Sequence, residues 1–171
     1  MTPEIARAAT SQGLDPRVVA ALIRVESGGN RWAWNPEPAY RYVWNVVTQR
    51  PFRALTPEEA ARKTPPADFP VLAGDRDQEW WGQQASWGLM QVMGALARER
   101  GFRGLYLTEL TDPALNLSIG CAHLAGLMRW AEGDLVQALA AYNGGKVGNT
   151  QAPFRNQAYA DRVLSALAEE P

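Results

Sequence analysis

Four pairs of a helix-capping residue followed by proline are spread along the chain and constrain its fold strongly. They are Thr2-Pro3, Asp15-Pro16, Thr56-Pro57 and Asp112-Pro113. A threonine or aspartate side chain can accept a hydrogen bond from the open N–H groups of a first helical turn. Proline fits the next position because that residue needs no N–H. Each pair therefore predicts the start of a helix.

These starts, together with apolar spacing and with glycines suited to helix C-termini, predict a largely helical chain. The expected helices lie near residues 3–11, 16–27, 57–63, 88–100, 113–131, 135–143 and 156–168. Strand-like alternation is limited to a short extended piece near Tyr40–Val47. The expected fold class is all-α, in a single domain over residues 1–171, a length that suffices for one core. Residues 64–86, rich in proline, glycine and charge, are expected to form a long ordered loop.

Composition excludes several classes of function. The net charge of −1 argues against duplex nucleic acid as a partner, because phosphate binding usually requires a basic surplus. One cysteine, Cys121, and one histidine, His123, leave no disulfide framework and no predicted metal site, and no cofactor is expected. We interpret Cys121 as a buried inert thiol and His123 as structural. No apolar stretch is long enough to span a membrane, and the first residues do not resemble a signal peptide.

The most informative residue is Glu26, which lies on the apolar face of the helix predicted over 16–27. It follows Val19, Leu22 and Ile23 at spacings of seven, four and three residues, so all four share one face. Burial raises the pKa of a carboxyl group, which suits a proton donor that works near neutral pH. Glu26 alone is also compatible with a side chain that merely reaches out at the last turn.

A second polar group lies on an apolar helix face. Tyr142 follows Leu135 and Leu139 at spacings of seven and three residues, so its hydroxyl needs a buried partner. A buried carboxyl group such as that of Glu26 is such a partner. Two polar residues on separate helices that can satisfy each other favour a functional site over chance.

Several short motifs, in the same order, resemble the signature of the soluble lytic transglycosylase catalytic domain. They are Glu26-Ser27, Gly88-Leu89-Met90-Gln91, Asp112-Pro113 with Asn116-Leu117 and Gly120, Ala141-Tyr142-Asn143, and the late Tyr159. The likeness covers roughly residues 14–34 and 85–166. It implies a lysozyme-like helical fold, related to goose-type lysozyme. The longer spacing between Ser27 and Gly88 marks residues 36–84 as an insertion rich in loops.

The resemblance implies an enzyme that cleaves the β-1,4 bond between N-acetylmuramic acid and N-acetylglucosamine in peptidoglycan. Glu26 would act first as general acid and then as general base, giving a 1,6-anhydromuramic product without consuming water. This one-carboxylate scheme differs from that of ordinary glycosidases. The implied substrate-binding residues are Ser27, Met90, Gln91, Tyr142, Asn143 and Tyr159. Tyr142 is expected to hydrogen-bond the Glu26 carboxyl group.

The insertion is dense in aromatic residues, which argues against disorder. We expect it to form one wall of the substrate groove, with Trp80 and Trp81 binding sugar. The pattern of RYVWN and SWGLMQVM, with no leader, looks closer to phage and prophage lysins than to secreted bacterial enzymes. We therefore expect action on the bacterial cell wall after delivery by another component, or with a leader absent from this sequence.

Two rival functions stay open at this point. A hydrolytic muramidase of the same fold would need a second carboxylate to activate water, and Glu37, Asp75, Asp77 and Glu79 are the candidates. A glycan-binding virion component that has lost turnover is the second rival. The retention of both Glu26 and Tyr142 argues against it.

Overall fold

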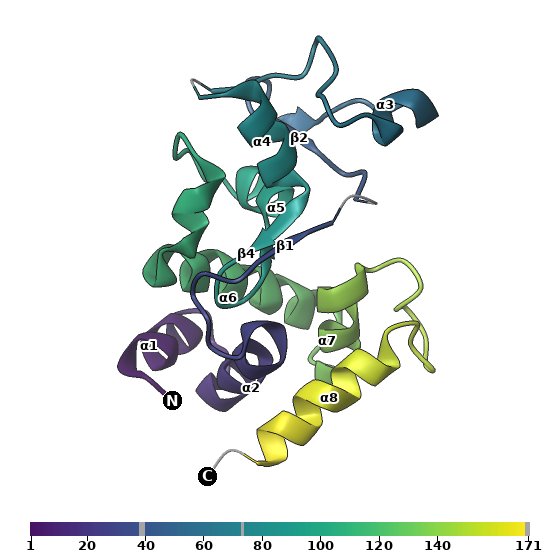
Figure 1. The fold of residues 1–171 in the computed structure, drawn as a ribbon. Coiled ribbons are helices and arrows are strands. Elements are labelled where there is room, and N and C mark those ends of the chain that lie inside the picture. The colour runs from purple at the N-terminus through teal and green to yellow at the C-terminus, as the bar shows by residue number, and fades with distance from the viewer. Residues whose placement is uncertain (38–39, 73, 170–171) are drawn as a thin grey trace. The chain divides into compact units, whose positions relative to one another are not determined.

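The computed structural model describes residues 1–37, 40–72 and 74–169 (Figure 1). Helices dominate these residues, as the sequence predicted. They are α1 (Pro3–Ser11), α2 (Pro16–Ser27), α3 (Pro57–Ala61), α4 (Arg76–Gln83), α5 (Gly94–Glu99), α6 (Pro113–Trp130), α7 (Leu135–Gly144), α8 (Gln157–Ala168) and the 3-10 helix η1 (Leu107–Thr111). The strands are short: β1 (Trp34–Pro36), β2 (Trp44–Asn45), β3 (Arg50–Pro51), β4 (Ala85–Trp87) and β5 (Val92–Met93).

The chain forms two compact units. The first unit comprises Met1–Gly29 and Leu117–Pro171, and the second comprises Asn30–Asn116. The insertion predicted at 36–84 falls within the second unit. The organisation of residues 1–171 as a single domain stays a prediction.

The first unit is built from helices whose starts the sequence predicted. Thr2 and Asp15 cap α1 and α2, and their side chains accept from Ile5 N and Arg17 N. Helix α8 packs against α2 and α7 (Figure 1). One cluster of its core joins α6 to α7 and contains Leu127, Ala131, Ala138 and Ala141, with Met128, Trp130 and Tyr142 packed against it. The predicted helices at 3–11, 16–27, 113–131, 135–143 and 156–168 agree with these elements to within a residue at each end.

The second unit contains two small antiparallel sheets. In the larger sheet the strand order is β1-β4-β5, with Trp34 opposite Trp87 and Ser86 opposite Met93. The smaller sheet pairs β2 with β3. Only Trp44–Asn45 of the extended piece expected near Tyr40–Val47 forms a strand.

The prediction of one helix over 88–100 is wrong. Residues 88–91 turn between β4 and β5, and α5 begins only at Gly94. Gly88 has a φ of +69°, and a Cβ at this position would lie 2.5 Å from Asn116 Nδ2 and 2.7 Å from the Leu110 carbonyl oxygen. Glycine is therefore required here, both because the backbone has a positive φ and because a side chain would not fit. From the sequence alone, Gly88 could be interpreted as a helix start.

The expectation of a loop throughout 64–86 is also wrong, because α4 lies within it. Asp75 caps α4 by accepting from Gln78 N at 2.9 Å. Glu79 on this helix forms a buried, two-point ion pair with Arg98 of α5, with distances of 2.9 Å to Nε and 2.7 Å to Nη2. The sequence of α4 is too polar to show the apolar spacing that predicts a helix, and the ion pair with α5 holds the helix in place.

Trp80 belongs to the core of the second unit. It packs edge-on against Phe69, with ring centroids 5.0 Å apart, in a cluster that also contains Val43. Its side chain is only 1% exposed, against 37% for its neighbour Trp81. Trp80 therefore does not present a free ring to sugar. The expectation that both Trp80 and Trp81 bind sugar is wrong for Trp80.

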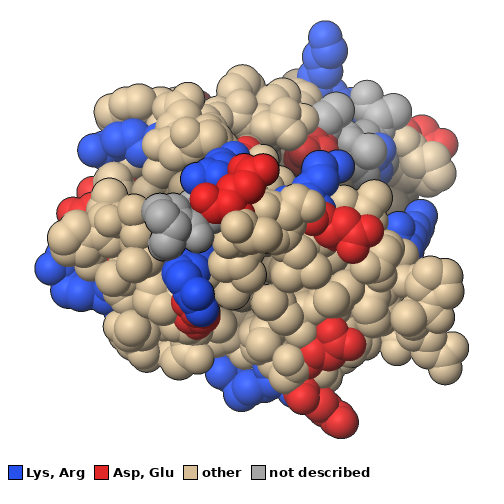
Figure 2. All heavy atoms as spheres, turned by 90° about the horizontal axis from the view of Figure 1, so that it is seen from below, with Lys and Arg blue, Asp and Glu red and all other residues tan. Residues whose placement is uncertain are grey.

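Acidic and basic side chains are mixed on the visible face of the molecule. On the face drawn in Figure 2, basic and acidic side chains of the described residues are interspersed, without a broad area of one sign. Among the described helices, none combines the length and the apolar character that crossing a membrane requires. The distribution agrees with a net charge close to zero.

Candidate active site

Glu26 occupies the last turn of α2, directly before the residue that ends the helix. Gly28 caps α2 in the left-handed conformation, with a φ of 60°, and its N–H donates to the Arg24 carbonyl group. Leu22 and Ile23, one turn earlier, are buried. Glu26 itself is half-buried, as its place on the apolar face predicted.

The Glu26 carboxylate accepts a hydrogen bond from the phenol of Tyr159. Tyr159 belongs to the first turn of α8 and is buried. The packing of α8 against α2 therefore brings together two residues that lie far apart in the sequence. This contact joins Glu26 to the residue that the family resemblance singled out near the end of the chain.

Three influences set the pKa of Glu26, and the net result is a raised value. Desolvation by burial is the largest and raises the pKa. The hydrogen bond from Tyr159 and the charge of Arg162 both lower it, but together they do not cancel the effect of burial. The guanidinium of Arg162 lies 5.6 Å from the centre of the Tyr159 ring. Glu26 is therefore biased towards its protonated form, as a general acid requires.

Tyr142 lies on α7 among the apolar residues between α6 and α7. Its ring is 5.3 Å from that of His123. Burial, the charge of Glu26 and that of Cys121 raise the pKa of the Tyr142 phenol well above its usual value. The influence of Glu26 indicates that the two groups are close. The hydrogen bond predicted between them stays a prediction, because the bond described at Glu26 comes from Tyr159.

Cys121 and His123 both lie on α6 near these groups. Cys121 is buried, and burial raises the pKa of its thiol to about 11. A thiol with so high a pKa is a poor nucleophile at neutral pH. In the described part of the chain, no three His, Cys, Asp or Glu side chains lie close enough together to hold a metal ion.

The residues that follow Glu26 and Tyr142 in the motifs, Ser27 and Asn143, both form hydrogen bonds within the protein. The Ser27 hydroxyl donates to the Ile23 carbonyl group at 3.2 Å and accepts from Gly29 N at 3.2 Å. Asn143 accepts from the amide of Asn156 at 2.8 Å. Their predicted contacts with substrate stay predictions.

Asn156 belongs to a polar network that the sequence did not reveal. Its Oδ1 accepts from the buried Asn149 at 3.2 Å, and its backbone N–H donates to Asn149 Oδ1 at 3.0 Å. Asn149 Nδ2 also donates to the Gly145 carbonyl group at 2.8 Å. The network ties the loop between α7 and α8 to the end of α7, and thereby positions Asn143.

The Gly88–Gln91 motif is rigidly held within the second unit. Asn116 is wholly buried, accepts from Met90 N at 2.8 Å, and donates to the carbonyl groups of Trp87 and Leu110 at 2.8 and 2.9 Å. The Gln91 amide accepts from the Ser86 hydroxyl at 2.8 Å. It donates to the Gly88 carbonyl group at 2.9 Å.

These contacts leave Met90 and Gln91 with few atoms to offer to sugar, although sugar contacts were predicted for both. The Met90 side chain is wholly buried, and both polar atoms of the Gln91 amide already bond within the protein. In this structure the motif chiefly shapes the turn after β4. Its contact with glycan stays a prediction.

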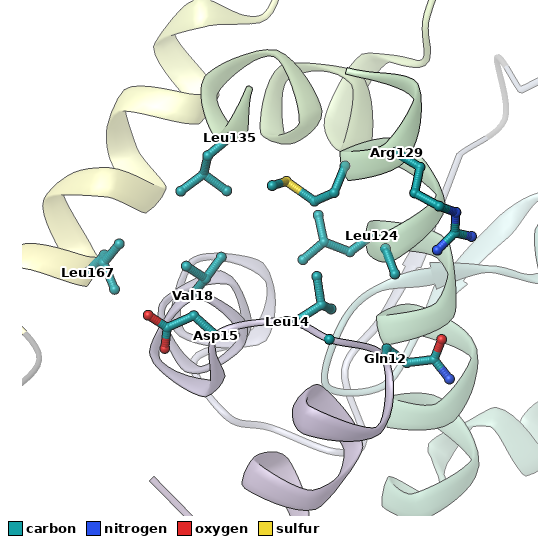
Figure 3. Close-up of a pocket in the computed structure, with 11 residues that line it drawn as sticks. Gln12, Leu14, Asp15, Val18, Leu124, Arg129, Leu135 and Leu167 are labelled. Atoms are coloured by element: carbon teal, nitrogen blue, oxygen red, sulfur yellow. The ribbon is translucent and has the colours of Figure 1, made fainter. Parts of the chain in front are cut away.

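A pocket of about 390 Å³ in the first unit lies between the start of α2 and helices α6, α7 and α8. Figure 3 shows apolar side chains, among them Leu14, Val18 and Leu124, turned towards this space. Neither Glu26 nor Tyr159 lines it. The pocket is therefore separate from the chemistry at the end of α2.

The candidate second carboxylates are placed as follows. Glu79 is committed to its buried pair with Arg98, and Asp75 caps α4. Glu37 accepts from the Asn35 amide at 2.5 Å, and Asp77 lies in the exposed first turn of α4. Among the described groups that shift the pKa of Glu26, there is a phenol and a guanidinium but no second carboxylate. The site thus offers one acid, a hydrogen-bond donor and a cation.

Comparisons with known proteins identify the family of the chain and a structure of similar fold. The family described as the transglycosylase SLT domain matches residues 3–164. An X-ray structure of the lytic transglycosylase Slt from Pseudomonas aeruginosa, in an inactive mutant form, is similar over 95% of this chain, with a TM-score of 0.59 and 21% identity. The match covers 22% of that protein, so this chain spans about a fifth of its length. Comparison with curated proteins gives no match.

Proposed function

Because the chain belongs to the transglycosylase SLT domain family, we propose that it cleaves the glycan strands of bacterial peptidoglycan as a lytic transglycosylase. The bond broken is the β-1,4 bond between N-acetylmuramic acid and N-acetylglucosamine. One observation carries the proposal: a half-buried glutamate, Glu26, has a raised pKa and accepts a hydrogen bond from a buried tyrosine. The protein acts on the cell wall in this account.

In the first step Glu26 is the general acid. Its carboxyl proton passes to the bridging oxygen as the bond from that oxygen to the anomeric carbon breaks. The electron pair of the broken bond stays on the leaving oxygen, and Glu26 becomes a carboxylate. The N-acetyl group of the muramic residue assists the departure, as the family resemblance implies.

In the second step the Glu26 carboxylate is the base. It takes the proton from the C6 hydroxyl group of the muramic residue, and that oxygen bonds to the anomeric carbon. The product carries a 1,6-anhydro ring, and Glu26 is protonated again. Water is neither consumed nor released.

The residues around Glu26 suit both steps. A phenol donor at Tyr159 stabilises the carboxylate formed in the first step, and the charge of Arg162 acts in the same direction. Burial opposes them and raises the pKa of the Glu26 carboxyl group, which favours its protonated form. Tyr142 adds a second phenol close to the same carboxyl group, and Ser27 and Asn143 are proposed to contact the sugar.

A one-carboxylate mechanism is favoured over hydrolysis with inversion. Inversion requires a second carboxylate that activates water. Within the first unit, the groups that shift the pKa of Glu26 are Tyr159 and Arg162, and in the second unit Glu79 is paired with Arg98.

Release of dye from labelled peptidoglycan by the purified chain tests the proposal. The wild-type protein is expected to release dye, and Glu26→Gln to lose at least about a hundredfold in rate, because general acid catalysis contributes about 10²–10⁴-fold. Glu132→Gln, at an exposed glutamate of the same unit, is the matched control and should keep full activity. A folded Glu26→Gln protein with more than about a tenth of the wild-type rate would rule out Glu26 as the acid.

A further inference from the structure

The second unit contains a hollow of about 300 Å³, and three of the seven residues that line it are tryptophans. Trp34, Trp81 and Trp87 supply its aromatic surface, Leu107 adds an aliphatic side chain, and Gln78 and Thr108 add an amide and a hydroxyl group. None of the residues that line it carries a charge. We call it the tryptophan hollow.

The rings are held in place by the fold. Trp34 and Trp87 are cross-strand partners on β1 and β4, with ring centroids 6.1 Å apart and planes inclined by 47°. The indole N–H of Trp87 donates to the Gly82 carbonyl group at 2.9 Å. Trp81 stands on α4, which the ion pair between Glu79 and Arg98 fixes to α5. A ligand would therefore meet a surface that needs little ordering.

Two of these tryptophan rings are exposed to solvent. Trp34 is 53% exposed and Trp81 is 37% exposed. Grouped exposed aromatic surface marks binding sites more often than scattered apolar residues do. Their grouping around one hollow indicates a ligand.

We propose that the tryptophan hollow is a sugar-binding site that takes an uncharged N-acetylglucosamine unit of the glycan strand. A sugar ring presents an apolar C–H face that stacks on indole, and its hydroxyl and acetamido groups need partners of the kind that Gln78 and Thr108 offer. The uncharged lining offers no cation for the carboxylates of the peptide that muramic acid carries, which favours the N-acetylglucosamine unit. A volume of about 300 Å³ lies at the low end for small-molecule sites, in keeping with one or two sugar units. The assignment rests on the proposed function for its choice of a glycan.

Binding of β-1,4-linked N-acetylglucosamine hexamer to the full chain, measured by isothermal titration calorimetry, tests the assignment. All proteins carry Glu26→Gln, so that no bond is cleaved during the titration. Trp34→Ala and Trp81→Ala are each expected to weaken binding on the order of tenfold, equivalent to about 1.4 kcal/mol, because each variant loses an aromatic face on which a sugar ring can stack.

Trp32→Ala is the matched control. Trp32 belongs to the same unit and is 65% exposed, but it does not line the hollow. Its replacement should leave the affinity for the hexamer unchanged. Thr108→Arg is a second variant at an exposed rim residue, so it keeps every tryptophan and blocks the hollow with a long charged side chain. It should weaken binding at least as much as the alanine variants.

Parental affinity in Trp34→Ala, Trp81→Ala and Thr108→Arg would overturn the site, as would an equal loss in Trp32→Ala. Dye release by the wild-type protein separates this result from the proposed function. If dye is released but the variants bind normally, the hollow is not a sugar site and the proposed function stands. If the variants lose binding but no dye is released, the sugar site stands and the proposed function fails.

Discussion

At the scale of single residues, the site is a balance of opposing influences on one carboxyl group. Burial raises the pKa of Glu26, while Tyr159 and Arg162 lower it. The sequence predicted the burial, because the apolar spacing of α2 places Glu26 on the inner face. Tyr159 came from the family resemblance. Arg162 was not predicted, since its influence depends on how α8 packs against α2 and no local pattern in the sequence encodes that.

The raised pKa of Glu26 predicts that Glu26→Gln stabilises the protein at neutral pH. Between the ordinary and the raised pKa, the folded state binds more protons at this site than the unfolded state. The free energy of unfolding therefore falls as pH rises through that interval, and above the folded pKa the whole cost is present. Glutamine removes the cost. Thermal unfolding should show a higher Tm for the variant at pH 7 and equal values below about pH 4.

Glu132→Gln is the control for this stability measurement and should follow the wild-type curve at every pH. An unchanged or lower Tm of Glu26→Gln at pH 7 would contradict a raised pKa. Activity and stability are therefore expected to move in opposite directions at this one residue.

Removal of either influence that lowers the pKa of Glu26 should move the alkaline limb of the pH profile. A general acid loses activity as pH rises through its pKa, and kcat/KM reports that value for the free enzyme. Arg162→Gln removes a positive charge, and Tyr159→Phe removes a hydrogen bond, so each should shift the limb to higher pH. Tyr159→Phe should also lower the rate on the order of tenfold, because the carboxylate formed in the first step loses a donor.

Arg17→Gln is the control for this pH profile. Arg17 lies on α2 and pairs with Asp15 at the exposed start of the helix, away from the influences on Glu26. Its profile should coincide with that of the wild-type protein. An alkaline limb that moves to lower pH in Arg162→Gln would refute the assignment of Glu26 as the titrating acid.

At the scale of elements, the sequence predicted helices well where the cap, the proline and the apolar spacing agree, as in α1, α2 and α6. It failed where long-range contacts decide the structure. The turn after β4 needs Gly88 because Asn116, distant in sequence, fills the space beside it. Helix α4 has a polar sequence, and its buried pair with α5 is visible only in three dimensions.

That buried pair gives a prediction for stability. Arg98→Met leaves Glu79 buried without its partner and should lower the free energy of unfolding by about 3–5 kcal/mol, as measured by denaturant titration. The double variant Arg98→Met with Glu79→Leu should recover most of the loss, because no charge is then left unpaired. Arg53→Met breaks exposed ion pairs with Glu59 and Asp68 and should lower the stability far less, because solvent screens these charges. Equal losses in Arg53→Met and Arg98→Met would contradict this account.

At the scale of the whole molecule, the two units hold different parts of the proposed site. The first unit holds Glu26 with its phenol and guanidinium, and the second holds the Gly88–Gln91 turn and the tryptophan hollow. The sequence predicted the class of fold, and the role of Glu26 as the acid stays a prediction. It expected sugar binding by the insertion through Trp80 and Trp81, but Trp80 is core, and the strand pairing of Trp34 with Trp87 was needed to identify the hollow.

The central claim is that the chain breaks peptidoglycan by an internal displacement that uses one carboxylate. Mass spectrometry of the fragments released from purified peptidoglycan tests it most directly, because an anhydro end is lighter than a reducing end by one water. The account predicts that the wild-type protein yields 1,6-anhydromuramic ends and that Glu26→Gln yields none. Fragments that carry reducing ends, with an oxygen taken up from isotopically labelled water, would contradict it and identify the chain as a hydrolase.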